Sequence, residues 1–271
     1  MHSKKLFSLA LSLFIAESVV ASPCKPKATT AAMETTATTE TGTTTGETTT
    51  TEAQTTTTAE AETTTTEAKT KTAVEPFCAQ TLLLANPTPI FDSESAFDDG
   101  YRNVVPPFPI EVYGVGSTDV YVGTNGFVPL NDGSSSYNNG PLPAQNLPSI
   151  SIMPYWDDLV IRAGTCNTGI YYDVYETDHG NTFTIEWQLG SIGLGAGTGE
   201  HFSATFYEDF PGLVRFEYYQ TTKHGSSATV GLQNEQQYSQ YSYNQDNSVP
   251  DQFFVEIDTS SGVAVIDTDP L

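Results

Sequence analysis

The chain has 271 residues, of which 33 are acidic and 10 are Lys or Arg, so its formal net charge is −23 at pH 7. A surface this acidic repels the phosphate backbone of nucleic acids and anionic membranes, which excludes nucleic acid as a partner. The length leaves room for one sizeable domain together with accessory segments.

Residues 1–21 have the layout of a secretory signal peptide. Lys4 and Lys5 form a charged start, 6–16 is a short apolar run, and Ala21 ends a stretch that fits a cleavage site. The apolar run is too short to span a bilayer as a helix. We therefore predict an exported protein that keeps no integral membrane segment after signal cleavage.

Residues 22–73 are predicted to be a disordered stalk. Between Thr29 and Thr72, 24 of 44 residues are threonine and none is aromatic. Such a segment cannot bury enough apolar surface to offset its ordering entropy. Its threonine runs are dense acceptors for O-linked sugars, as in mucin-like stalks. The expected role is a glycosylated spacer that holds the following domain away from a surface.

Three cysteines remain after the predicted cleavage: Cys24, Cys78 and Cys166. Disulfides persist outside the cell, and two of the cysteines fall in the region expected to fold, so we pair Cys78 with Cys166. This bond would stabilise the fold by up to roughly 4–5 kcal/mol. A Cys24–Cys78 bond, which would close the stalk into a loop, is the alternative. Otherwise Cys24 is free or links to another chain.

Residues 74–271 show the period-two alternation of antiparallel β-sheet with one buried face. Frequent turn residues separate many short strands, and no stretch has a convincing helical period. This pattern predicts an all-β fold with an antiparallel β-sandwich. Residues expected to face the core are Phe183, Ile185, Trp187 and Leu189; Val214, Phe216 and Tyr218; Ala228, Val230 and Leu232; and Phe253, Val255 and Ile257.

Three turns are predicted to connect hairpins. Asn125-Gly126 supplies the two positive φ angles of a tight type I′ turn. Residues 178–181 join the strand around 170–175 to the strand around 182–188. Residues 209–212 join two further strands, at 202–208 and 213–219.

An ordered set of motifs goes beyond a generic β pattern. The motifs are VPPFPIEVYG at 105–114, VYVGTNGFV at 120–128, ISIMPYWDDL at 150–159, GIYY at 169–172 and FTIEW at 183–187. This ordered set resembles the nidogen-like (NIDO) domain of extracellular matrix and cell-surface proteins, and the resemblance covers about 97–234. It implies an extracellular, β-rich interaction module that is often linked to cell–matrix adhesion and has no established catalysis.

The chain departs from the family pattern in two respects. It lacks the EGF-like modules that accompany the domain in animal matrix proteins. It also has Asp157-Asp158 after the tryptophan, where a small residue commonly precedes a single Asp. The short chain with its Thr-rich stalk is more similar to a secreted or wall protein of a microbe such as a fungus.

Asp157 and Asp158 are the candidate metal ligands. Clustered carboxylates near backbone oxygens can hold calcium in extracellular proteins, and Asp98-Asp99 provides a second acidic pair. The spacing matches no EF-hand loop, and solvated loop acids are the alternative interpretation. We expect no cofactor, with calcium as the one exception to test.

Tyr238, Tyr241 and Tyr243 are the candidate binding residues. They are interleaved with Ser, Gln and Asn, and such rings and amides stack on and hydrogen-bond to sugars or protein surfaces. A loop whose rings pack on the edge of the sandwich is the alternative.

The sequence thus predicts a non-enzymatic binding or adhesion module on a glycosylated stalk, secreted or associated with a cell wall. Its partner would be an extracellular matrix or cell-wall protein, or a glycan. A carbohydrate-binding wall module is the first alternative. A secreted glycoside hydrolase is the second, since Glu186, Glu208 and Glu217 occupy strand positions and such enzymes need two carboxylates.

Overall fold

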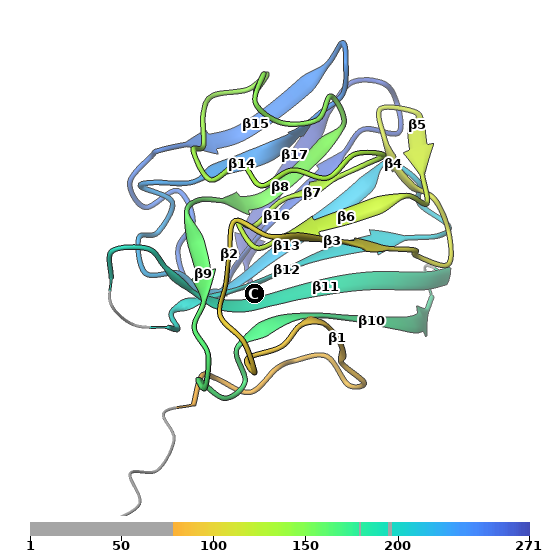
Figure 1. The fold of residues 1–271 in the computed structure, drawn as a ribbon. Coiled ribbons are helices and arrows are strands. Elements are labelled where there is room, and N and C mark those ends of the chain that lie inside the picture. The colour runs from red at the N-terminus through yellow and green to blue at the C-terminus, as the bar shows by residue number, and fades with distance from the viewer. Residues whose placement is uncertain (1–77, 179, 195–196) are drawn as a thin grey trace, which may run out of the picture. The chain divides into compact units, whose positions relative to one another are not determined.

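The computed structural model describes residues 78–178, 180–194 and 197–271; the predicted signal peptide, the stalk and Cys24 lie outside these ranges. Within them the chain forms 17 strands and no helix, so no helix there could cross a membrane. The strand pairs of its sheets are antiparallel, as Figure 1 allows the reader to follow. The predicted all-β, antiparallel fold is confirmed.

The larger sheet has nine strands. Seven of them lie in the order β1–β10–β11–β12–β13–β16–β17, while β9 pairs with β11 and β2 pairs with β9. Their bounds are β1 Thr88–Phe91, β2 Phe97–Asp98, β9 Leu159–Ile161, β10 Gly169–Thr177, β11 Gly180–Ser191, β12 Glu200–Tyr207, β13 Leu213–Gln220, β16 Phe253–Asp258 and β17 Val265–Pro270.

The second sheet has four strands in the order β15–β14–β8–β7, and two two-stranded sheets, β3–β6 and β4–β5, complete the fold. In Figure 1 β14 and β15 lie above the long strands β10 to β12. The bounds are β3 Tyr101–Val104, β4 Ile110–Val112, β5 Val115–Ser117, β6 Val120–Gly123, β7 Val128–Pro129, β8 Ser151–Trp156, β14 Thr229–Gln233 and β15 Tyr238–Tyr243.

The main core lies between the two sheets and contains every residue of the four predicted inward-facing sets except Phe253, which is only partly buried. Two hydrogen bonds tie the layers together. Tyr218 donates from its hydroxyl to the Pro154 carbonyl at 2.7 Å, and Trp187 donates from Nε1 to the Gly123 carbonyl at 3.0 Å. A second apolar cluster that includes Phe127, Met153 and Trp156 accounts for the complete burial of β8.

The predicted hairpins β10–β11 and β12–β13 are present, with Thr177 opposite Gly180 in the first. The predicted type I′ turn at Asn125-Gly126 is wrong. Gly126 has φ +70°, whereas Asn125 is not among the positive-φ residues. Gly123 accepts from the Gly126 amide at 3.4 Å and donates to the Phe127 carbonyl at 3.0 Å, which gives a longer turn with glycine in the left-handed position.

The expectation of one buried face is also wrong for β11. Its polar residues Thr182, Thr184, Glu186 and Gln188 are buried as well. The segment 79–86 covers part of this polar face, at Glu186. The amides of Leu83 and Leu84 donate to the Glu186 carboxylate at 2.9–3.1 Å. Alternation along a strand cannot reveal a distant segment that covers its polar face.

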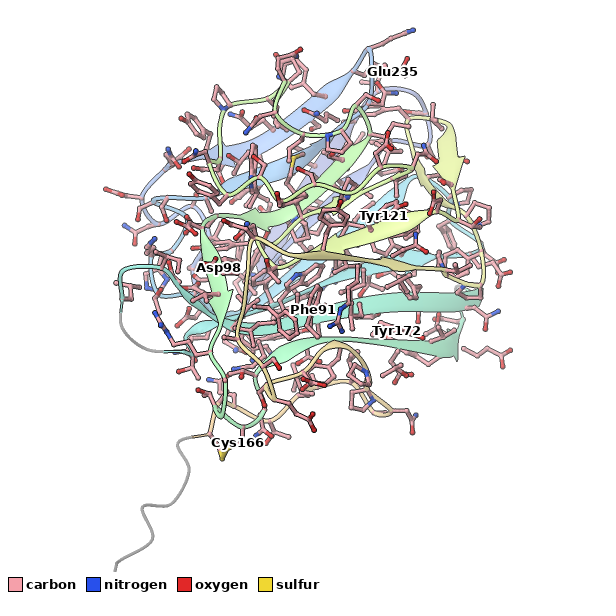
Figure 2. All side chains as sticks on the ribbon, in the orientation of Figure 1. Phe91, Asp98, Tyr121, Cys166, Tyr172 and Glu235 are labelled. Carbon is pink, nitrogen blue, oxygen red and sulfur yellow. A yellow bond between two sulfur atoms is a disulfide. The ribbon has the colours of Figure 1, made fainter. Side chains whose placement is uncertain are left out.

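The covering segment begins at a disulfide. Cys78 is bonded to Cys166, as the sequence predicted, and the Ala79 amide donates to the Cys166 carbonyl at 2.9 Å. Figure 2 shows Cys166 at the lower end of the folded region and Glu235 at the opposite end. The described chain therefore starts at one end of the head, far from the β14–β15 turn.

Candidate functional site

The three tyrosines of β15 do not form one exposed row. Tyr238 is 52% exposed and Tyr243 36%, but Tyr241 is half-buried and donates from its hydroxyl to the Ser248 carbonyl at 2.9 Å. Tyr238 and Tyr241 are three residues apart, so they face opposite sides of the strand. Val230 pairs with Ser242 and Gly231 with Gln240, so Tyr241 is the extra residue of a bulge, which returns Tyr243 to the exposed side. Tyr241 packs on the core beside Phe253 instead. Only Tyr238 joins a larger surface.

That surface is formed where three turns meet, and we name it the loop-end hollow. It consists of two adjoining depressions of about 470 and 290 Å³, which share Tyr113, Gln236 and Gln237. Gln237 donates from Nε2 to the Gly262 carbonyl at 2.7 Å, which joins two of the turns. The remaining lining residues are Val115, Ile150, Asn234, Glu235, Tyr238, Ser239, Gly262, Val263 and Ala264.

Tyr113 occupies the centre of the loop-end hollow in an unusual conformation. Its φ is +50° and that of Gly114 is +75°, so these two residues make the type I′ turn between β4 and β5. A bulky residue is a genuine outlier at positive φ, where Asn or Gly is preferred. The Tyr113 amide donates to Thr259 Oγ1 at 3.0 Å, which helps hold the turn. Tyr113 ends the motif at 105–114, but nothing in the residue pattern predicts that its ring lies among three turns.

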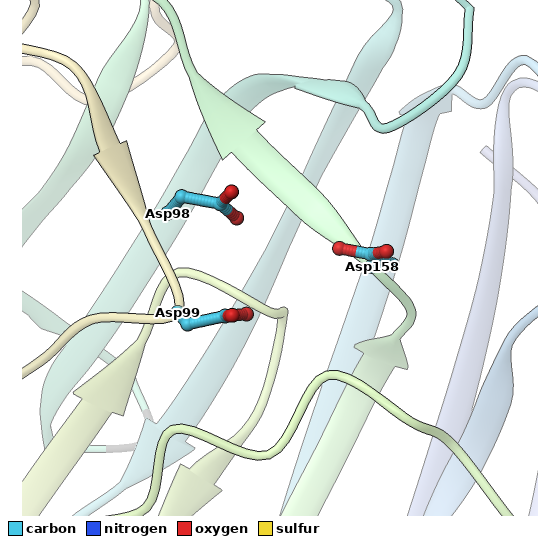
Figure 3. Close-up of side chains that lie close together, drawn as sticks. All are labelled: Asp98, Asp99 and Asp158. Atoms are coloured by element: carbon cyan, nitrogen blue, oxygen red, sulfur yellow. The ribbon is translucent and has the colours of Figure 1, made fainter.

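Three carboxylates meet elsewhere in the head, at the point shown in Figure 3. The nearest carboxylate oxygens of Asp98, Asp99 and Asp158 lie within 4.8 Å of one another. Partial burial, followed by the neighbouring charges, raises the pKa of Asp98 and of Asp158 above the usual range. Asn125 donates from Nδ2 to Asp99 Oδ1 at 2.9 Å.

Asp157 does not belong to this trio, although the sequence grouped it with Asp158. Its Oδ2 accepts from the Ser227 hydroxyl at 2.6 Å and from Lys223 Nζ at 3.3 Å. Its Oδ1 accepts from the Asp158 amide at 2.9 Å. Asp157 and Asp158 are adjacent in the sequence, but their carboxylates therefore make different contacts. A divalent cation at the trio would have to use Asp98, Asp99 and Asp158.

The glutamates considered for hydrolysis are engaged in structural contacts. Glu186 is buried, and besides two backbone amides its Oε1 accepts from His201 Nε2 at 2.6 Å. Glu217 accepts from Arg215 Nε at 2.7 Å and from the Tyr219 hydroxyl at 2.9 Å. Glu208 accepts from Asn181 Nδ2 at 2.6 Å. Each carboxylate therefore already accepts hydrogen bonds from other residues of the head.

The chain matches a known protein family over most of its length. Residues 71–264 match the family described as NIDO related. The chain belongs to the NIDO-related family. The nidogen-like resemblance of its motifs is therefore confirmed. No curated protein and no solved structure matches the chain.

The motifs that carry the NIDO resemblance dock against one another in the head. The Tyr155 amide donates to the Gly126 carbonyl at 3.1 Å, and the Asp157 amide donates to the Asn125 carbonyl at 3.3 Å. Asn125 Oδ1 accepts from the Leu159 amide at 3.0 Å. These residues build the scaffold, whereas the loop-end hollow lies on the turns. A NIDO-related head with a disulfide is consistent with an extracellular protein.

Proposed function

We propose that this NIDO-related chain is a secreted or wall-associated binding protein that acts in adhesion without a catalytic step. The head contacts an extracellular protein of a matrix or cell wall through the loop-end hollow. The Thr-rich segment 22–73 serves as an O-glycosylated spacer that displays the head. Several displayed copies would add avidity without any new contact.

The observation that carries this proposal is the low charge of the loop-end hollow together with its two tyrosine rings. From residue 74 onward the chain has 25 acidic and four basic residues, yet only Glu235 among the residues lining the hollow is charged. Protein interfaces are depleted in charge at their centre and enriched in tyrosine. Tyr113 and Tyr238 supply two such rings on one surface.

Two further observations support the proposal. The described chain begins at Cys78, bonded to Cys166, and the hollow is at the opposite end near Glu235 (Figure 2). The preceding chain is therefore joined to the head at the end away from the hollow. The positive φ of Tyr113 is the kind of local strain that persists where a side chain must be presented in one orientation.

The test is a binding array with the full-length protein. Extracellular matrix and wall proteins and a panel of glycans are printed side by side and probed with calcium or with a chelator. We expect saturable binding to a protein that is unchanged by the chelator, since the hollow uses tyrosine and amide groups. If the chelator abolishes binding, the binding site would instead be at Asp98, Asp99 and Asp158. If the protein binds none of the printed proteins, the proposal is contradicted.

A further inference from the structure

The outer face of the larger sheet contains a groove that is distinct from the loop-end hollow. It has a volume of about 380 Å³ and crosses β10 to β13, which is within the range of about 300–1,000 Å³ typical of small-molecule sites. Leu83, Leu84 and Ala85 form one wall of the groove. Its floor and rim are Asp173, Tyr175, Thr184, Glu186, Ser203, Thr205, Glu217 and Tyr219.

The first part of the floor is a chain of three hydroxyl groups. Tyr175 and Thr184 are 3.1 Å apart at their oxygens, and Thr184 and Thr205 are 3.0 Å apart. A hydroxyl has one donor hydrogen and two acceptor lone pairs. Two contacts among three hydroxyls therefore consume two hydrogens, and lone pairs remain for a ligand.

The second part of the floor has a defined direction. The Tyr219 hydroxyl donates to Glu217 Oε2 at 2.9 Å, so the 2.9 Å contact between Ser203 and Tyr219 requires Ser203 to be the donor. The lone pairs of Ser203 are then unused. Asp173 adds a carboxylate whose two oxygens each accept one backbone amide, from Asn86 and from Val174. The floor is therefore rich in acceptors and has few hydrogens left to donate.

This chemistry selects a class of ligand. A phosphate or sulfate would bring more acceptors and negative charge to Asp173 and Glu217, so it is repelled. A molecule with many hydroxyl donors is complementary. Tyr175, 42% exposed, and Leu83, 60% exposed, offer apolar surface at the rim for the non-polar face of a ring. Together these features describe a saccharide.

The wall of the groove is held in place before any ligand arrives. Gln80 lies 2.9 Å from His201 Nδ1, and it donates from Nε2 to Gln220 at 2.8 Å. Leu83 and Leu84 are fixed by Glu186, and the Asn86 amide donates to Asp173 Oδ2 at 2.9 Å. A pre-organised wall reduces the ordering cost of binding. The segment between the Cys78–Cys166 disulfide and β1 thus acts as a rigid side of the groove.

We propose that this groove binds a neutral saccharide, with sugar hydroxyls donating to Ser203, Thr184 and Asp173 and a ring face lying on Tyr175. The inference goes beyond the proposed protein contact, because the groove and the loop-end hollow share no lining residue. A protein partner at one end and a sugar on the sheet face would allow one head to bridge two kinds of surface.

The test is calorimetric titration of the full-length protein with soluble neutral tetrasaccharides built from glucose, mannose or N-acetylglucosamine. Tetralysine and a sulfated oligosaccharide are the charged probes. We expect saturable binding of at least one neutral sugar. If no neutral sugar binds, or if tetralysine alone binds, the proposal is overturned.

Variants locate the sugar site. Tyr175→Ala removes the exposed ring and should weaken the sugar at least about tenfold. Tyr137→Ala is the matched control, since Tyr137 is 45% exposed and does not line the groove. Ser203→Ala should also weaken binding. Equal affinities for Tyr175→Ala and wild type would overturn the assignment. Tyr238→Ala, which tests the loop-end hollow, should leave sugar binding unchanged, so the two proposals can fail separately.

Discussion

Raising the pH from about 5 to about 9 should lower the free energy of unfolding by about 3 kcal/mol through Glu200 alone. Burial raises the pKa of Glu200 to about 7 from the ordinary value of 4.5, although hydrogen bonds from Thr222 act in the opposite direction. The folded state therefore favours the protonated acid. This contribution to stability is fully present below pH 4.5 and is lost as the pH rises through 7.

Glu200→Gln tests this expectation by urea unfolding of the full-length protein at both pH values. The amide keeps an acceptor for Thr222 but cannot ionise, so the loss of stability with rising pH should be smaller by about 3 kcal/mol. Glu94→Gln is the matched control, because it removes the same charge from an exposed position. If the Glu200 variant loses as much stability as wild type, the buried carboxyl does not control the pH dependence.

Gly126→Ala should unfold the head or cost more than about 4 kcal/mol. A Cβ at this position would lie 2.1 Å from the Tyr155 carbonyl oxygen and 2.9 Å from its carbonyl carbon. These are backbone atoms of β8 in the centre of the fold, so they cannot move aside cheaply. The positive φ of +70° adds strain for any residue with a side chain.

Gly164→Ala is the comparison that separates the steric clash from the backbone strain. Gly164 has a similar φ of +79°, but a Cβ there would meet nothing within 4 Å. We expect a cost of about 1–2 kcal/mol from the left-handed conformation alone. Thermal unfolding of both variants would measure the difference. Similar melting temperatures for the two variants would contradict the contact between the turn and β8.

The strands could be predicted because the alternation that marks each one involves residues close together in the sequence. Phe183, Ile185 and Trp187 alternate with polar residues, and hydrophobic burial requires that such a set share one face. The β10–β11 and β12–β13 hairpins followed from turn residues for the same reason. The turn at Asn125 was misassigned because its side chain bonds to Asp99 and Leu159, which are distant in the sequence.

The candidate sites were less predictable. Tyr238 and Tyr241 are three residues apart, a spacing that already places them on opposite faces of a regular strand. The bulge at Tyr241 then puts Tyr243 on the solvent side with Tyr238. The loop-end hollow depends on three turns meeting, and the groove depends on the covering segment 79–86. Neither arrangement has a periodic signal in the sequence.

The most direct test of the central claim is to repeat the protein array with Tyr238→Ala and Tyr243→Ala beside wild type. Both tyrosines are exposed on β15, but only Tyr238 lines the loop-end hollow. We predict that Tyr238→Ala weakens binding to the captured protein by about 30-fold, as expected for an interface hot spot, and that Tyr243→Ala binds as wild type does. Unchanged binding by Tyr238→Ala, or equal losses in both variants, would contradict a contact through the loop-end hollow.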